Sequence, residues 1–405
     1  MSSLSWEGIT FGIELEFMTP CPENKRIWRR EHPTAAARLN MAEILAKSTS
    51  LPIACECVHP SDHPSDKTCP ICTSVPGENR HDKICVLTHP EVLDVGTKLE
   101  TNFFYFKAEF LNRSNDLSRE RDWPAVEIAT PIFRAGELQS GLPTMKTVLT
   151  KIRQMGLEIN ADESCGMHVH VGVENGMTLR LAQKITTLAI LLETTLLLRL
   201  VAPCRWDNIF SLPLCENSAM ATEDRHQHPG DHAPLDQYIP GMKAMHPGKW
   251  NNNDPSHFYS MFNAVWSTTS LRTLKYILFR KRMYKCGFTL SLRSKDVQLG
   301  ELENSPSTVE FRYSQMVFDH ELLRNWTEIV AGIVALAQAD ADEFKKCVEL
   351  IMKINHEAEG MAWKVLLKDV FKLEHRIPEW EAQLAKFKCG EYISHLDEKA
   401  LLKPE

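Results

Sequence analysis

The chain has 405 residues, with 46 basic and 53 acidic side chains and a formal net charge of −7. Hydrophobic residues make up 43% of the chain and charged residues 24%, which argues against extensive disorder and against a membrane protein. The charges form no long run of one sign, and this disfavours a nucleic-acid binder. We therefore expect a globular protein whose partners are small molecules.

Residues 1–12 lack the basic start and the apolar run of a secretory signal, so we expect a cytoplasmic protein. The most apolar stretch, 179–202, carries Arg180, Lys184 and Glu193 at intervals. Such charges would be costly in a bilayer. We expect this stretch to be a half-buried core helix, and we expect no contact with a membrane.

In the first part of the chain, residues 11–17 alternate apolar and acidic side chains and predict a strand. The Ala-, Arg- and Leu-rich segment 28–47 predicts a helix. Residues 50–98, rich in Pro, Cys and His, are predicted to be a loop-like insertion. A β-prone run bounded by prolines, 124–131, predicts a second strand, and a helix is expected at 142–155.

Residues 167–173 alternate again and predict a third strand, which the long apolar helix follows. Segment 216–257 is rich in Pro, Asn and His, so we expect a mobile loop there. Strands at 288–292 and 308–313 are predicted to form a long hairpin. The spacing of apolar residues then predicts three helices, at 322–339, 343–354 and 377–388.

This order of elements predicts an α+β fold. We expect residues 1–340 to form the main domain, with the insertion and the mobile loop inside it. Residues 341–405 are expected to form a helical extension that packs on this domain. The chain is long enough for a sizeable hydrophobic core.

Three of the predicted strands carry pairs of polar groups two residues apart. The pairs are Glu14 with Glu16, His168 with His170, and Glu310 with Arg312. Because side chains alternate along a strand, both members of a pair lie on one face and their apolar neighbours lie on the other. Glu127, between two apolar residues, repeats the pattern with a single carboxylate.

Any one of these pairs is explained by a strand with one solvated face. Together, however, the four glutamates would repel one another in a sheltered site unless cations neutralised them. Oxygen ligands with one or two imidazoles suit Mg²⁺ or Mn²⁺, and no thiolate beside them favours a softer metal. Arg312 adds a forked donor for a phosphate group. These residues predict a site for metal ions and phosphate.

The motifs that carry these residues resemble those of the amidoligase family, relatives of glutamate-cysteine ligase and glutamine synthetase. They are FGIELE at 11–16, VEIATP at 126–131, GMHVHVG at 166–172 and TVEFR at 308–312. Each motif is short, but the four occur in the family's order over residues 8–335. The resemblance implies a funnel of antiparallel strands of the glutamine synthetase and glutamate-cysteine ligase type, flanked by helices.

The resemblance also implies roles for individual residues. The implied metal ligands are Glu14, Glu16, Glu127, His168, His170 and Glu310, with His170 either a ligand or a support for one. Arg312 would act on the transferred phosphoryl group beside Glu14 and Glu310, and Arg205 and Asn208 would lie near the substrate. The implied activity is an ATP- and Mg²⁺- or Mn²⁺-dependent ligase. It would join a small carboxylate to an amine, such as amino acids, through an acyl phosphate, and would release ADP and phosphate.

Two positions depart from the family pattern. The family usually carries an Asp-x-Ser segment before its second acidic strand, but residues 107–110, Lys-Ala-Glu-Phe, give no clear counterpart. Ser291 stands where the family has Asn. The substrates, the pathway and the oligomeric state are left open by the sequence.

A second candidate metal site lies in residues 50–98. Cys55-x-Cys57 and Cys69-x-x-Cys72 offer four thiolates that could hold a structural Zn²⁺. Such a site would stabilise a segment that has little core of its own. The alternative is an insertion that contains cysteines but binds no metal.

Three other functions are compatible with the same residues. His168 and His170 could belong to a zinc-dependent hydrolase, although its parallel barrel would carry such a pair near the first strand. A non-catalytic descendant that binds nucleotide would explain the missing Asp-x-Ser segment. A phosphotransferase of the guanidino-kinase type shares the superfamily's sheet, and analysis of the products would distinguish it.

Overall fold

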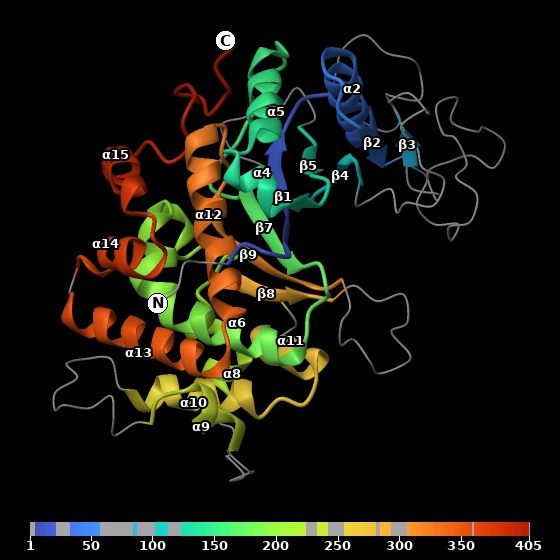
Figure 1. The fold of residues 1–405 in the computed structure, drawn as a ribbon. Helices are drawn as coiled ribbons and strands as arrows, with labels where there is room; N and C mark the ends of the chain where they lie inside the picture. Colours follow the sequence, from blue (N-terminus) through green and yellow to red (C-terminus); the bar gives the residue numbers. More distant parts are fainter. Residues whose placement is uncertain are drawn as a thin grey trace.

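The structure is a computed structural model. It describes residues 5–21, 33–56, 84–86, 102–111, 123–223, 233–241, 255–280, 284–292, 306–358 and 360–404. These parts form one open sheet flanked by helices (Figure 1). The predicted α+β class is confirmed, and the sheet is mostly antiparallel. The closed funnel stays a prediction.

The sheet contains nine strands within the described residues. Eight of them follow the spatial order β3 (Ile84–Val86), β2 (Ile53–Glu56), β4 (Phe104–Ala108), β5 (Ala125–Ala129), β1 (Ile9–Met18), β7 (Gly166–Val173), β9 (Thr308–Gln315) and β8 (Phe288–Ser291). The short strand β6 (Phe133–Arg134) pairs with the start of β1. Only β2 and β4 run parallel among these pairs. The three strands with paired polar groups, β1, β7 and β9, are consecutive neighbours in this order.

Helices cover one face of this sheet (Figure 1). They are α2 (Pro33–Ser48), α4 (Ala135–Gln139), α5 (Pro143–Gln154) and α12 (His320–Ala337). Helix α6 (Leu179–Leu192) packs against α12 and continues through a π-helical turn, η3 (Glu193–Leu197), and a 3-10 turn, η4 (Leu198–Leu200).

The remaining helical elements are shorter or follow α12. They are η5 (Pro203–Arg205), α7 (Leu214–Asn217), α8 (Ala219–Thr222), α9 (Ala233–Tyr238), α10 (Pro255–Trp266), α11 (Leu271–Leu278), α13 (Ala341–Glu357), α14 (Ala362–Val365), η8 (Leu366–Val370), η9 (Glu374–Arg376) and α15 (Ile377–Lys388).

Side-chain caps fix the starts of the long helices. Thr178 accepts a hydrogen bond from the Leu181 amide at the start of α6, and Asp319 accepts two at the start of α12. Asp340 accepts one such hydrogen bond at the start of α13. Each cap satisfies amides that the first helical turn leaves without partners, and a cap of this kind contributes about 1 kcal/mol.

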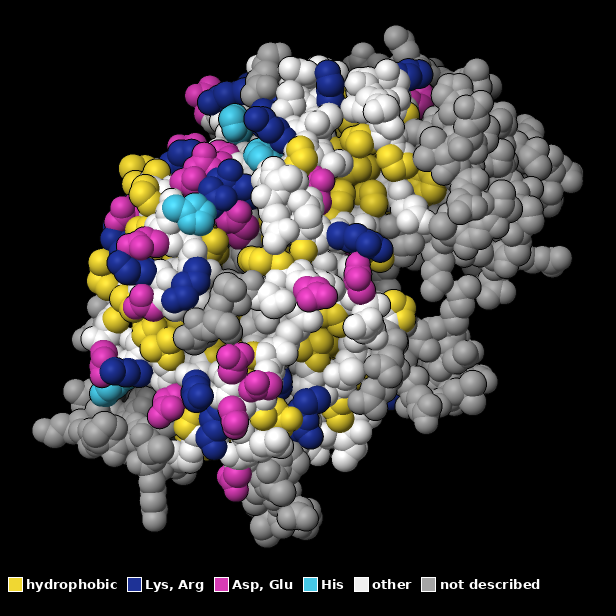
Figure 2. Space-filling model, viewed as in Figure 1, with side chains coloured by type: hydrophobic (Ala, Val, Ile, Leu, Met, Phe, Trp, Pro, Cys, Tyr) yellow, Lys and Arg dark blue, Asp and Glu magenta, His cyan; other side chains and the backbone are white. Residues whose placement is uncertain are grey.

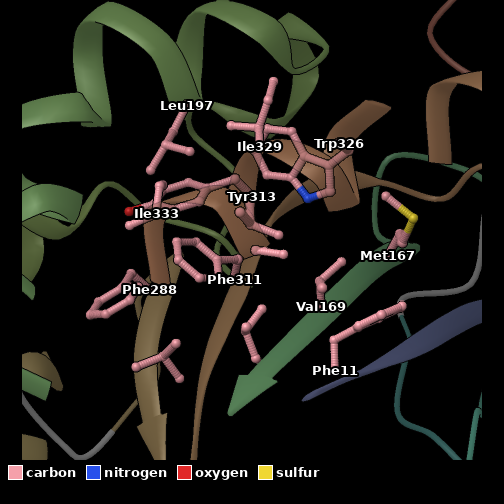
Figure 3. Packing of buried hydrophobic residues seen from close by; sticks show 14 of the residues in the cluster. Phe11, Met167, Val169, Leu197, Phe288, Phe311, Tyr313, Trp326, Ile329 and Ile333 are labelled. Atoms are coloured by element: carbon pink, nitrogen blue, oxygen red, sulfur yellow. The ribbon is translucent and has the colours of Figure 1, made fainter. Parts of the chain in front are cut away.

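The main core lies between the sheet and α12. Figure 3 shows apolar side chains of the sheet facing those of the helix: Phe11, Met167, Val169, Phe288, Phe311 and Tyr313 opposite Trp326, Ile329 and Ile333. Full burial of one such side chain contributes about 1.5–3 kcal/mol. Because this face of β1, β7 and β9 is committed to the core, alternation turns their glutamates and histidines to the opposite face.

Helix α6 is more deeply buried than the sequence suggested. The stretch Leu179–Leu200 is long and apolar enough to cross a membrane by composition, but 78% of its apolar window lies inside the protein. Lys184 and Glu193 are also buried, so the predicted core helix is confirmed, and this part of it is more than half-buried. Lys184 is accommodated because its ammonium donates to the Ala339 carbonyl at 2.5 Å.

Two segments that were predicted to be loops contain regular structure. Within residues 50–98, β2 and β3 extend the sheet beyond β4. Within residues 216–257, the described parts are largely helical, from the end of α7 to the start of α10, and Met220 and Ile239 reach the core. The loop predictions are therefore wrong there, because a few apolar residues in a polar segment are enough to anchor short helices.

The C-terminal helices share the core of the sheet domain. Phe344 of α13 and Trp380 of α15 belong to the same buried cluster as the strands. An ion pair also joins α12 to η9, since Arg376 Nη2 lies 2.8 Å from Glu328 Oε1. Acidic and basic side chains are interspersed over the described surface of this face (Figure 2). The division of the chain at residue 340 stays a prediction.

Candidate functional site

Neighbouring strands bring the predicted ligands together on the face of the sheet opposite α12. The strand register pairs Glu16 with Glu127, Glu14 with His168, and His170 with Glu310. Because successive pairs are linked by side chains two residues apart, they form a continuous row across β5, β1, β7 and β9. We call these six residues the polar row.

The polar row is sheltered from solvent. Its most exposed side chains are those of Glu14, at 14%, and His170, at 12%. Glu310 and His168 are at 0% and 1%. Burial of these charged groups is therefore unfavourable, and each of them needs a nearby partner of opposite charge or a hydrogen-bond donor.

A β-bulge places Arg312 beside this row. Met167 pairs with Ser314, whereas Val169 pairs with Phe311, so β9 has one residue more than β7 over this interval. The extra residue lies opposite His168. Bulges of this kind redirect side chains, and the Arg312 guanidinium lies 3.1 Å from His168 Nδ1.

His168 is held as a neutral imidazole of defined tautomer. Burial and the neighbouring Arg312 lower the pKa of His168 to about 3. Since a guanidinium can only donate, Nδ1 of His168 must accept and Nε2 must carry the proton. Nδ1 also lies 3.5 Å from Glu14 Oε2 and 3.3 Å from Glu16 Oε1. An unprotonated ring nitrogen therefore lies beside two carboxylates, and it could bind a metal ion if Arg312 released it.

The carboxylates, with one imidazole, fall into two clusters whose ligand atoms lie close enough together to contact a single metal ion. Ligand atoms of Glu14, His168 and Glu310 all lie within 4.8 Å of one another. Those of Glu16, Glu109 and Glu127 do the same. Oxygen ligands with a single imidazole are the donor set that Mg²⁺ and Mn²⁺ prefer.

Glu109 is a site residue that the sequence prediction missed. It follows β4 and supplies the third carboxylate of the second cluster. With Lys107 it repeats the i and i+2 spacing of the other strands, which was the available signal. Glu109 also lies before the second acidic strand, where the family usually carries Asp-x-Ser.

Protein cations, also missed, neutralise part of the negative charge. Lys107 Nζ lies 2.5 Å from Glu127 Oε1 and 3.2 Å from Glu14 Oε1, between the two clusters. Lys285 Nζ lies 2.9 Å from Glu310 Oε2. Metal ions are therefore not the sole source of compensation for these carboxylates, as the sequence argument assumed. Lys285 lies outside any strand pattern, so spacing gave no signal for it.

Glu310 is the most heavily bonded carboxylate of the row. Besides Lys285, it accepts hydrogen bonds from the Arg312 guanidinium and from Ser291 Oγ, the latter at 2.9 Å. Burial would raise the pKa of Glu310, but Arg312, His170 and Lys285 outweigh burial and hold it well below its usual range. Ser291 thus keeps a polar contact at the position where the family has Asn.

The other carboxyl groups differ in their charge state. Burial would raise the pKa of Glu14, but the neighbouring His170 and Lys107 hold it well below its usual range. Burial raises the pKa of Glu16 to about 8, although Arg312 opposes this shift. Burial and the neighbouring Glu14 raise the pKa of Glu127 well above its usual range. Glu14 is therefore anionic, while Glu16 and Glu127 are driven toward the neutral form.

Gly166 permits the close approach of these groups. A Cβ atom there would lie 2.7 Å from His168 Nε2 and 3.1 Å from Glu16 Oε2. The Gly166 amide also donates to Glu16 Oε2 at 2.9 Å. The glycine is required for space beside the polar row.

Arg205 and Asn208, predicted near the substrate, contact backbone instead. Arg205 is fully buried, and its guanidinium donates to the carbonyls of Glu163, Arg312 and Tyr313 at 3.0, 3.0 and 3.3 Å. Asn208 Nδ2 donates to the Glu163 carbonyl at 2.7 Å. We interpret both as residues that hold the backbone around Arg312, and their contact with substrate stays a prediction.

The predicted zinc site is placed only in part. Cys55 is buried in β2, and its backbone pairs with Cys85 of β3. Cys57, Cys69 and Cys72 lie outside the described residues. The zinc site therefore stays a prediction.

The site is therefore a group of carboxylates and imidazoles on one face of a mostly antiparallel sheet. In a comparison with protein families, the model described as "Putative amidoligase enzyme" matches residues 81–273. This segment is therefore similar to the amidoligase family, in agreement with the resemblance seen in the motifs. Neither the curated proteins nor the solved structures gave a significant match. Glu127, His168 and His170 lie inside the matched segment, whereas β1 and β9 lie outside it.

The raised pKa of Glu16 predicts a pH-dependent stability. Its pKa is about 8 in the folded protein and near the ordinary value of 4.5 in the unfolded chain, so the folded state retains a proton that the unfolded state releases. The contribution of Glu16 to the free energy of unfolding should be fully present below about pH 4.5 and should be lost as the pH rises to about 8. Glu16→Gln cannot titrate and should not show this loss. Urea unfolding in EDTA across this range measures the difference, with Glu391→Gln, at an exposed position, as the control. Parallel profiles for wild type and Glu16→Gln would contradict the raised pKa.

Proposed function

We propose that the protein is an ATP-dependent ligase that joins a small carboxylate to an amine. The observation that carries this proposal is the polar row, with its two adjacent ligand clusters on an antiparallel sheet. The amidoligase segment supports it, because that family's name describes the same reaction class. The substrates are proposed by chemical class only.

The two clusters suit divalent cations. Glu14, His168 and Glu310 would hold one, and Glu16, Glu109 and Glu127 would hold the other. When bound, Mg²⁺ or Mn²⁺ would neutralise the phosphates of ATP and increase the electrophilicity of the γ-phosphorus. Binding would also convert Glu16 and Glu127 to carboxylates, because a cation lowers the pKa of its ligands.

The reaction needs activation because a carboxylate has oxide as its leaving group. In the proposed scheme a carboxylate oxygen attacks the γ-phosphorus, the bond to ADP breaks, and an acyl phosphate forms. The amine then attacks the acyl carbon, phosphate leaves, and the amine loses a proton to solvent. No covalent bond to the protein is required, so positioning and electrostatics carry the acceleration.

Arg312 is the residue proposed to meet charge on the transferred phosphoryl group. Its guanidinium contacts Glu310 and His168, both members of the first cluster. A guanidinium is a planar fork that can bind two phosphoryl oxygens at once, and Arg312 would exchange part of these bonds for the phosphoryl oxygens. Lys107 and Lys285 would retain part of the charge balance around it.

The alternative functions have different support. The zinc-hydrolase hypothesis requires a parallel barrel, whereas the described sheet is open and mostly antiparallel. The non-catalytic reading is favoured by one observation, namely that Lys107 and Arg312 already bind carboxylates of the row. Measurement of turnover separates this reading from the ligase.

The ligase proposal predicts metal-dependent ATP turnover. The purified protein, given a panel of amino acids and amines with Mg²⁺, should release ADP and phosphate in step with amide formation. EDTA should abolish turnover, and added Mg²⁺ or Mn²⁺ should restore it, because the side chains of the clusters cannot replace a divalent cation. Full activity in EDTA would contradict the proposed metal sites. ATP binding without turnover on any substrate would favour the non-catalytic reading, and transfer of phosphate to a guanidino compound would favour the phosphotransferase.

The role of Arg312 predicts a separation of binding from chemistry. Arg312→Lys keeps the charge but loses the fork, so the single-turnover rate should fall about 10²-fold while ATP affinity changes only a few-fold. Arg324→Lys is the matched control, since Arg324 bonds Glu379 away from the polar row. If Arg312 only neutralises Glu310, the substitution will instead lower the melting temperature and ATP affinity together and leave the single-turnover rate unchanged.

A further inference from the structure

A buried carboxylate that the proposed chemistry does not use lies behind Arg312. Glu193 begins the π-helical turn η3 at the end of α6 and is 0% exposed. Isolated π-helical turns inside α-helices occur frequently at functional sites. An unpaired carboxylate in this environment would be strongly unfavourable, so its partners define its role.

Three donors form hydrogen bonds with the carboxylate of Glu193. Oε1 accepts from the Leu214 amide and from the Tyr313 hydroxyl, both at 2.5 Å, and Oε2 accepts from the Cys215 amide at 2.7 Å. These donors come from two separate elements, β9 and the start of α7. Glu193 therefore joins the long helix to both.

Tyr313, the first of these partners, is the neighbour of Arg312 in the chain. Alternation directs the Tyr313 ring toward the core, where Figure 3 shows it near Leu197 of η3, and directs Arg312 toward the polar row. The ring lies against Gly287, where a Cβ atom would be 2.3 Å from a ring carbon. Tyr313 thus has a fixed position at the bulge of β9.

The second partner of Glu193, the start of α7, follows a segment that contacts Arg312. Residues 203–213 lead directly to Leu214, and they bind Arg312 at two points. Phe210 O accepts from Arg312 Nε at 3.4 Å, and the Arg205 guanidinium donates to the Arg312 carbonyl at 3.0 Å. The Arg312 amide donates to the Gly287 carbonyl at 2.7 Å, and the Gly287 amide donates to Leu212 O at 2.8 Å. The backbone and side chain of Arg312 are therefore held by elements that Glu193 fastens together.

We propose that Glu193 is a positioning residue that fixes the Arg312 guanidinium over the polar row, by bonding Tyr313 on one side and the start of α7 on the other. This inference rests on the proposed function for its effect on rate, but its structural part does not. Glu193→Gln keeps the volume of the side chain and places an NH₂ group among three donors. The bonds to Tyr313 and to residues 214–215 cannot then all form.

The first test measures amide hydrogen exchange and requires no activity. Glu193→Gln should increase exchange in peptides covering 203–215 and 308–315 in a protein that remains folded. Tyr313→Phe, which removes one bond only, should give a smaller change in the same peptides. Glu328→Gln is the matched control: it also removes a buried carboxylate, which bonds Arg376, and should leave these peptides unchanged. Unchanged exchange in Glu193→Gln would overturn the proposal.

The second test is a double-mutant cycle on single-turnover rate. Glu193→Gln should lower the rate about 10-fold when Arg312 is present and by less than about 2-fold in the Arg312→Lys background, because misplacement of a group matters only if the group acts. Equal reductions in both backgrounds would overturn positioning through Arg312. If the wild type turns over no ATP, the ligase proposal fails, while hydrogen exchange still decides whether Glu193 fixes this region.

Discussion

The cost of removing charge from water is the constraint on which the site depends. Four glutamates and two histidines lie on one face of the sheet, and none has a side chain more than 14% exposed. Burial raises the pKa of Glu16 and Glu127, whereas Glu14 and Glu310 stay anionic because cationic or imidazole groups adjoin them. The arrangement therefore combines fixed negative charge with carboxyl groups that can release a proton when a cation binds.

This arrangement follows from the alternation of side chains between the two faces of the strands. Phe11, Val169 and Phe311 turn toward α12, and the residues between them turn toward the polar row. The same core that stabilises the sheet thus fixes the spacing of the ligands. The bulge of β9 adds the one irregularity, and Glu193, Tyr313 and Gly287 define the backbone around it.

Sequence alone was sufficient for the parts that rest on periodicity. It predicted the strands β1, β5, β7, β8 and β9 and the helices α2, α5, α6, α12, α13 and α15, but not α4, α7 to α11 or α14. It also placed the six members of the polar row on strands that the structure makes neighbours. It missed Lys285 and the role of Glu193, because neither belongs to an alternating pattern and both act through contacts distant in sequence. Lys107 and Glu109 had the right spacing, between Phe106, Ala108 and Phe110, but a lysine paired with a glutamate did not suggest a ligand pair. Buried charge in α6 was underestimated, since composition does not reveal which partners a fold will supply.

Manganese offers the most direct test of the central claim, that the polar row and Glu109 hold divalent cations in two clusters. Crystals of the protein grown with Mn²⁺ and an ATP analogue would be measured for anomalous scattering. The account predicts one peak among Glu14, His168 and Glu310 and a second among Glu16, Glu109 and Glu127. Mn²⁺ bound only elsewhere, or a site in which Lys107 and Arg312 retain their carboxylates and exclude the metal, would contradict it.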